Sequence, residues 1–370
     1  MNIMDRKYDS IAQNGAIRST MNMDFTVDRS KAFKQEKFTA NFFTETKIDL
    51  KQSFDVPINV VCFSPFDESY DILACCCKER IYVYRIIINE KTSIDKNVVN
   101  YEFISDYICG SPCVSLCFGP KTSFQNPTEQ CLNLSAATED FSILVLTQKL
   151  FKFRSADDSE QQFFVGHINH INDMAFEPIN GDYLASTGDD CMCIIRSLKE
   201  NNCNKSDTRI MLSSPGMTLK WHKNEPNKLF VAEKKGLIRF YDTITRVAVM
   251  SFDCNCYPLI SSDWCFENNL FIGCAANKDL YFWDTSLTSL PIKVIRTNFE
   301  RLLEFQFFDS KLIAYRGRPN NFLCVKNFIT NQTFIEKEFV AGRGISWNRK
   351  IPLLAVGGPK CIHLFRFNVF

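Results

Sequence analysis

Seven short apolar stretches, each ending in an aromatic residue, recur along this chain and constrain its fold more than any other feature. The seven aromatic positions are Phe63, Phe118, Phe176, Trp221, Trp264, Phe307 and Trp347. Successive positions lie about 40 to 58 residues apart, and the longer intervals fall in the first half of the chain. A period of this length is typical of β-propellers, in which each repeat forms one four-stranded blade. The pattern therefore predicts seven blades, with insertions in the early ones.

The third repeat shows how one blade is built. A Gly-His pair ending at His167 precedes an apolar strand that closes at Phe176. A second strand contains Ser186, and a tight turn with Asp189 and Asp190 leads into a third strand. Polar groups buried inside a blade need partners, so we expect a hydrogen-bonded network of His167, Ser186 and Asp190. We prefer this structural role to a general base at His167 or a catalytic carboxylate pair in the turn.

Two later repeats carry a more specific signature. Blades four and five end their third strands in the pairs Tyr241-Asp242 and Trp283-Asp284, and an aromatic residue followed by Asp at this place is typical of WD repeats. Blade three has Arg196 where the aromatic residue would stand, so its network lacks the usual fourth member. Together the repeats predict an all-β fold, a seven-bladed WD40-type β-propeller.

The fourth strand of blade seven has to come from another part of the chain. The sequence ends soon after the third strand of that blade, and we expect residues 40–48 (ANFFTETKI) to close the ring. Joining segments about 320 residues apart costs on the order of 5 kcal/mol of chain entropy. One strand of main-chain pairing with buried apolar side chains offsets that cost and removes an exposed sheet edge. We therefore assign residues 36–370 to the propeller and residues 1–35 to a flexible N-terminal extension.

The composition excludes several functional classes. With 43 basic and 42 acidic residues the net charge is +1, which gives no reason to expect direct contact with nucleic acid. No run approaches the roughly 20 apolar residues that span a bilayer, and the first residues lack the apolar core of a signal peptide. The 17 cysteines then favour free thiols in a reducing compartment, the cytosol or nucleus. The spacing of Cys109, Cys113 and Cys117 is not that of a zinc site.

Motifs of catalysis are missing from the sequence. It has no phosphate-binding glycine loop, nucleophile elbow or metalloprotease helix. His222 and His363 lie at or near predicted strands, where packing or surface exposure is the simpler interpretation. Arg316 and Arg318 on a propeller rim could bind RNA or a phosphopeptide, but we favour a solvated turn. We therefore predict no enzymatic activity, no catalytic, cofactor-binding or metal-binding residues, and no cofactor.

Several longer runs carry a resemblance to one family. They are residues 166–178 (GHINHINDMAFEP), 185–190 (ASTGDD), 213–217 (SSPGM), 220–222 (KWH), 231–242 (VAEKKGLIRFYD), 344–347 (GISW) and 351–358 (IPLLAVGG). The sequences of the runs at 213–217 and 231–242 are not those of a general WD repeat. With them the chain from residue 164 onward resembles the nucleoporin thirty-seven family, WD-repeat propellers of the nuclear pore scaffold. Residues 56–147 match only in their blade pattern, and residues 1–35 do not match.

The resemblance implies a non-enzymatic subunit of the Y-shaped outer-ring complex of the nuclear pore. Such a propeller docks on a large helical-solenoid nucleoporin and contacts other subunits of the complex, without inserting into the membrane. Membership implies a place at the nuclear envelope within the nuclear pore complex, and in animals at kinetochores during mitosis. It also implies roles in pore assembly and in transport of mRNA and protein. The residues alone leave two alternatives open, a chromatin- or peptide-binding WD40 adaptor and a substrate receptor of a ubiquitin ligase.

Overall fold

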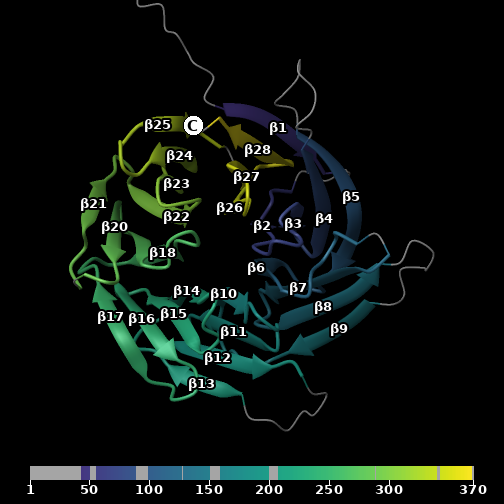
Figure 1. The fold of residues 1–370 in the computed structure, drawn as a ribbon, viewed down its shortest axis with the longest axis horizontal. Helices are drawn as coiled ribbons and strands as arrows, with labels where there is room; N and C mark the ends of the chain where they lie inside the picture. The colour runs from purple at the N-terminus through teal and green to yellow at the C-terminus, as the bar shows by residue number, and fades with distance from the viewer. Residues whose placement is uncertain are drawn as a thin grey trace, which may run out of the picture. The chain divides into compact units, whose positions relative to one another are not determined.

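Seven four-stranded antiparallel sheets stand around a common centre in the computed structural model (Figure 1). The structure describes residues 43–50, 56–88, 99–126, 128–150, 159–199, 207–287, 289–339 and 342–368. They all belong to one compact unit, residues 41–370. The predicted all-β, seven-bladed propeller is confirmed. The expected extension, residues 1–35, and the expected boundary at residue 36 lie outside the described residues.

In each of the first six blades, four consecutive strands run from the centre outward. Blade one consists of β2 (Val60–Phe63), β3 (Ile72–Cys77), β4 (Arg80–Ile88) and β5 (Val99–Ile108). Blade two consists of β6 (Cys113–Phe118), β7 (Gln130–Thr138), β8 (Ile143–Leu150) and β9 (Ser159–Phe164). Blade three consists of β10 (Ile171–Phe176), β11 (Tyr183–Gly188), β12 (Met192–Ser197) and β13 (Thr208–Met211).

The later blades follow the same order. Blade four consists of β14 (Gly216–Trp221), β15 (Lys228–Glu233), β16 (Leu237–Asp242) and β17 (Ala248–Asp253). Blade five consists of β18 (Leu259–Trp264), β19 (Phe271–Ala276), β20 (Asp279–Asp284) and β21 (Lys293–Arg296). Blade six consists of β22 (Arg301–Phe307), β23 (Leu312–Arg318), β24 (Phe322–Asn327) and β25 (Thr333–Lys337). Blade seven consists of β26 (Ile345–Trp347), β27 (Leu353–Gly357), β28 (Cys361–Phe367) and β1 (Phe43–Asp49).

Each aromatic position of the sequence repeat is the last residue of an innermost strand, as at Phe63 in β2 and Trp347 in β26. Successive side chains of a strand point to opposite faces, and in a propeller both faces of a blade are covered by its neighbours. The second strands are therefore buried almost throughout. In β3 (ILACCC) every residue is buried, and Cys75, Cys76 and Cys77 pack there as small hydrophobic side chains.

The ring closes through the first strand of the described chain. Strand β1 pairs antiparallel with β28 over seven residues, from Phe43 opposite Phe367 to Asp49 opposite Cys361. The predicted N-terminal closing strand is thus confirmed, although residues 40–42 of the predicted segment are outside the described part. On β1, Glu45 accepts a hydrogen bond at 2.7 Å from Nδ1 of His363, which lies on the strand beside it.

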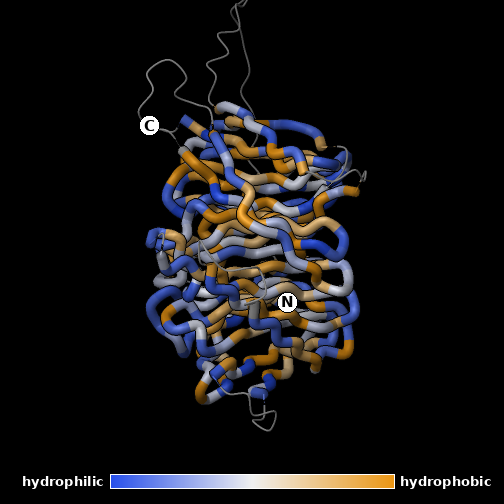
Figure 2. The backbone as a smooth tube through the Cα atoms, turned by 90° about the vertical axis from the view of Figure 1, so that its right-hand side faces the viewer, coloured by the Kyte–Doolittle hydropathy of each residue, from blue (hydrophilic) through white to orange (hydrophobic). Residues whose placement is uncertain are grey.

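Aromatic side chains fill the spaces between blades. Between blades five and six, Phe282 lies 5.7 Å from Phe305 and 4.4 Å from Phe328, measured between ring centroids. The Phe282 side chain is fully buried, and truncating such a residue costs about 3–5 kcal/mol. Figure 2, a view turned by 90°, shows hydrophobic and hydrophilic residues alternating along the strands. The core is divided among separate clusters of buried side chains and does not form one apolar layer.

Hydrogen bonds at one recurring position join the innermost strands of neighbouring blades. The side chain just before the terminal aromatic residue accepts a bond from the N–H of that aromatic residue in the next blade. Asp263 accepts from Phe307 at 2.9 Å, and Ser346 of blade seven accepts from Phe63 of blade one at 2.8 Å. Burial raises the pKa of Asp263 to about 6. The bond from blade one to blade seven closes the ring a second time, near its centre.

Candidate functional site

In blade three the structure brings together all three residues that were predicted to form a network. His167 Nδ1 lies 2.7 Å from Asp190 Oδ2, and His167 Nε2 lies 2.8 Å from Ser186 Oγ. The ring is a neutral tautomer that donates from Nδ1 and accepts from the serine hydroxyl. Burial lowers the pKa of His167, and the bond to Asp190 opposes that effect. The stabilising role of this network remains a prediction.

Arg196 occupies the place of the missing aromatic residue and ties the β9–β10 loop to blade three. Its side chain is buried, donates a 2.9 Å bond to the carbonyl of Val165 and lies over the ring of Phe164. Gly166 has a φ of +152°, and a Cβ added there would lie 2.4 Å from a guanidinium nitrogen of Arg196. As placed, the guanidinium occupies the space that a Cβ at residue 166 would take.

Blade four holds a second polar cluster that the sequence reading missed. The fully buried Glu233, at the end of β15, accepts bonds from the N–H groups of Ser213 at 2.8 Å and Ser214 at 2.9 Å. Arg239 of β16 forms an ion pair with the other carboxylate oxygen. All four residues belong to the runs at 213–217 and 231–242, which carry much of the family resemblance. The unusual sequence of these two runs was the available signal. Residue spacing alone did not show that the four side chains meet in the fold.

The residues predicted as WD-type strand ends lie at the end of their blades opposite to the His167 and Glu233 clusters. Trp283 is fully buried, and its indole N–H donates to the Ser289 carbonyl at 2.9 Å. Tyr241 is also buried and packs in the core between blades three and four. Asp242 accepts bonds from the N–H groups of Ile244 and Thr245, and Asp284 accepts one from Ser286. The two aspartates thus cap the turns that follow them.

Arg316 corrects an expectation from the sequence. It does not lie in a solvated turn, because β23 continues through Gly317 to Arg318. The Arg316 side chain is buried, lies over the ring of Phe339 and donates a 3.0 Å bond to the carbonyl of Gly342. Its charge therefore supports the inner loop of blade seven. It is not available to an anionic ligand on the rim.

His222 packs at the lower end of blade four, and by "lower" we mean the end at which the innermost strands finish. It is buried, its ring lies edge-on to Trp264, and its Nδ1 accepts bonds from the N–H groups of Asn224 and Glu225. Burial lowers the pKa of His222. The imidazole therefore stabilises the β14–β15 loop.

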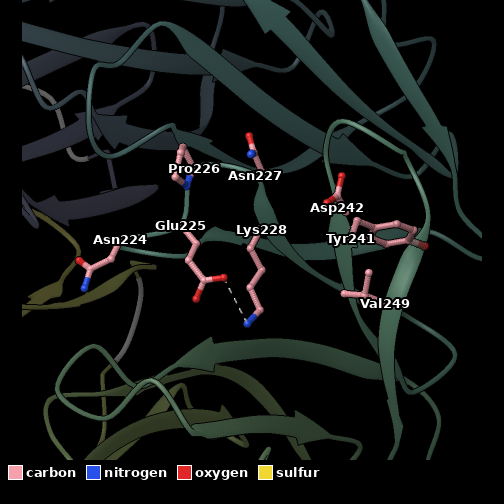
Figure 3. A pocket seen from close by; sticks show the side chains of 8 residues that line it. All are labelled: Asn224, Glu225, Pro226, Asn227, Lys228, Tyr241, Asp242 and Val249. Carbon is pink, nitrogen blue, oxygen red and sulfur yellow. Dashed lines mark ion pairs between the residues drawn. The ribbon is translucent and has the colours of Figure 1, made fainter.

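Two adjoining pockets flank this lower end of blade four. The first, of about 480 Å³, is drawn in Figure 3, and its lining residues are Asn224, Glu225, Pro226, Asn227, Lys228, Tyr241, Asp242 and Val249. The second, of about 370 Å³, reaches blade five through Trp264, Leu270 and Thr285. Both share Glu225 and Lys228, whose charged groups are 3.8 Å apart, so the pair forms a ridge between the pockets. Such shallow, partly apolar hollows suit the side chains of a protein partner.

Across the part of the chain that the structure describes, no group of three His, Cys, Asp or Glu side chains is arranged to hold a metal ion. No helix within the described ranges is long and apolar enough to cross a membrane.

Comparison with known proteins extends the resemblance beyond the half noticed in the sequence. No protein-family model matches the chain. The nucleoporin Nup37 of Mus musculus is 29% identical over 308 residues, which cover 81% of this chain and 91% of that protein. Nup37 of Homo sapiens is 27% identical over the same shares, and Nup37 of Drosophila melanogaster is 29% identical over 245 residues, 65% of this chain and 72% of that protein. A match over 81% of the chain includes blades that the motifs alone did not identify.

Proposed function

We propose that this chain, a WD-repeat β-propeller homologous to the Nup37 nucleoporins, is a non-enzymatic scaffold subunit of the nuclear pore complex. The observation that carries the proposal is the extent of the match, which covers 91% of the mouse and human proteins. A match over nearly a whole propeller supports a shared role.

In this role the propeller docks on a large helical-solenoid nucleoporin of the Y-shaped outer-ring complex. A ring closed by β1 and by the bond between Ser346 and Phe63 is rigid before binding, so little ordering entropy is lost when the partner docks. The chain would act at the nuclear envelope, support pore assembly and transport of mRNA and protein, and in animal cells join kinetochores during mitosis.

The state of three of the four histidines supports a non-enzymatic role. His167, His222 and His363 are buried, and each is engaged by neighbours within the fold. A general acid or base must reach a substrate, and these three side chains instead hold loops and strands in place.

Affinity purification from nuclear-envelope extract tests the proposal. We expect the tagged chain to recover the outer-ring scaffold, with its helical-solenoid subunit, and a fluorescent fusion to mark the nuclear rim. Recovery of histones alone, or of a cullin alone, would instead support a chromatin adaptor or a ubiquitin-ligase receptor. A diffuse nucleoplasmic signal without a rim would also contradict the proposal.

We further propose that residues 36–370 are the functional propeller and that residues 1–35 are dispensable for assembly. A chain lacking residues 1–35 should enter the complex as efficiently as the full chain, measured by co-purification at equal expression. A clear loss of incorporation would show that this segment contributes to docking.

A further inference from the structure

The connections between the third and fourth strands differ sharply around the ring. In blades one to three they are residues 89–98, 151–158 and 198–207, and each contains four charged residues. In blades four to six they are residues 243–247, 285–292 and 328–332, and Arg246 is the one charged residue among them. We call these three connections, together with Val249 and Met250, the lower rim of blades four to six.

The lower rim exposes large apolar side chains to solvent. Those of Ile244, Val247, Val249, Leu287, Leu290 and Ile329 are between 59% and 70% exposed. Neighbouring blades also contact one another at this end. Met250 lines the second pocket together with Leu270 and Thr285 of blade five, and Lys293 of blade five donates a hydrogen bond to the Phe328 carbonyl of blade six. Apolar surface gathered in this way marks a site of protein contact.

The outer strand of blade four lacks the Lys, Arg or Glu residues that the other outer strands carry. Exposed edge strands usually carry charged residues that prevent pairing with other chains. Strands β1, β5, β9, β13, β21 and β25 each contain Lys, Arg or Glu, whereas β17 (AVMSFD) contains none of these and has one charge, Asp253, at its end. A bulge between its partners Phe240 and Tyr241 interrupts the ladder of β17. An added strand would therefore pair poorly here, whereas a helix that packs its side chains on this face needs no such pairing.

The charge of the lower rim specifies its partner further. Arg246 is exposed, and among the described residues its side chain forms no ion pair. It lies in the β16–β17 turn, between Thr245 and Val247, with a φ of +62°. A complementary partner thus presents an apolar face with a carboxylate at its margin.

We propose that the lower rim of blades four to six binds an amphipathic α-helix whose apolar side chains pack on the exposed apolar residues of the rim and on the second pocket, beside Met250 and Leu270, and whose acidic residue pairs with Arg246. This inference rests on the proposed function, because it names the surface that a helical-solenoid partner uses. Helices recognised in this way place side chains at i, i+3, i+4 and i+7 into hollows of the receptor.

Binding of the full chain to the purified helical-solenoid nucleoporin of the Y-shaped complex tests the inference by calorimetry. Replacing Ile244→Asp together with Leu290→Asp should weaken binding about 100-fold, because two apolar contacts are lost and two charges are buried. The matched control is Val165→Asp with Ile168→Asp, at the opposite end of blade three, where the side chains are 78% and 85% exposed. The control should bind like the unmodified chain.

The charge contact has its own test. Arg246→Glu should weaken binding about tenfold at low salt and reduce the dependence of affinity on salt concentration. Unfolding temperatures of all variants, compared with that of the unmodified chain, exclude a folding defect. If the unmodified chain does not bind, the proposed function itself fails and the inference with it. If that chain binds and the lower-rim variant binds equally tightly, or the control weakens as much, only the inference is overturned.

Discussion

Blades three and four are neighbours, and each fixes the loop before its innermost strand with a buried polar cluster, but the chemistry differs. Blade three uses a neutral histidine, His167, between Ser186 and Asp190. Blade four uses the carboxylate Glu233, held by two backbone N–H groups and Arg239. In both, a side chain bridges the loop to the second strand or to the turn that follows it. In these two blades the same place thus holds a polar bridge, built from different residue types.

The two bridges should differ in how much they stabilise the fold. A buried carboxylate that satisfies several donors leaves all of them unpaired when it is removed, whereas loss of a neutral imidazole leaves fewer polar groups stranded. The following predictions test this difference, starting with the largest expected effect.

Glu233→Ala should lower the free energy of unfolding by roughly 3 kcal/mol, because the N–H groups of Ser213 and Ser214 and the Arg239 guanidinium lose their acceptor. Urea unfolding followed by tryptophan fluorescence measures the loss. Glu225→Ala, at a mostly exposed carboxylate of the same blade, is the control and should change stability by less than about 0.5 kcal/mol. Equal effects of the two substitutions would show that the blade-four cluster is not a stabilising bridge.

His167→Ala should cost roughly 2 kcal/mol, which is less than the loss of Glu233. Asp190→Ala, made in the His167→Ala background, should cost about 1 kcal/mol less than the same change in the unmodified chain, because its main partner is already gone. The double-mutant cycle is measured by urea unfolding. Additive effects would mean that the two residues do not form one unit.

Arg196→Lys should cost about 1 kcal/mol, since lysine cannot keep both the bond to the Val165 carbonyl and the flat contact with Phe164. The unfolding temperature should fall by a few degrees. Gly166→Ala should cost at least as much, because the added Cβ meets the same guanidinium. An unchanged unfolding temperature in both variants would show that Arg196 does not stabilise the β9–β10 loop.

The smallest expected effect is a pH dependence of the blade-three bridge. Burial holds the pKa of His167 below its ordinary value, so the unfolded chain binds the proton more readily than the folded chain. The stability that His167 contributes is therefore complete above its ordinary pKa of about 6.5 and declines as the pH falls through that value. The deficit in unfolding temperature of His167→Gln should shrink between pH 7.5 and pH 5.5. The deficit of Leu229→Ala, a core variant without a titrating group, should not shrink. If the deficits of both variants shrank in parallel, the pH dependence would not come from His167.

Most of the fold could be predicted from the sequence because its signals are local and repeated. An aromatic residue ends each innermost strand, and one polar network follows the usual order of a WD blade. Ring closure was predictable from counting strands, since blade seven lacked one and a strand-like segment stood near the N-terminus.

The remaining features depend on contacts between elements that no local pattern shows. Glu233 looks like an ordinary residue before a turn, and its partners at 213 and 214 belong to another loop. The Arg-Gly-Arg run around Gly317 reads as a turn, yet blade packing keeps it in a strand and buries Arg316. The lower rim of blades four to six is apparent only when the third-to-fourth connections of several blades are seen side by side.

Closure by β1 also fixes the order in which the strands can pair during synthesis of the chain. Of the strands described, β1 leaves the ribosome first, but its partner β28 is made last, so β1 must wait unpaired while six blades take shape. Pairing over so long a separation is slow compared with local pairing, and it completes the fold only after synthesis has passed residue 367. Newly made chains therefore pass through a stage with two unprotected sheet edges, at β1 and β28, and molecular chaperones have the most to shield at that stage.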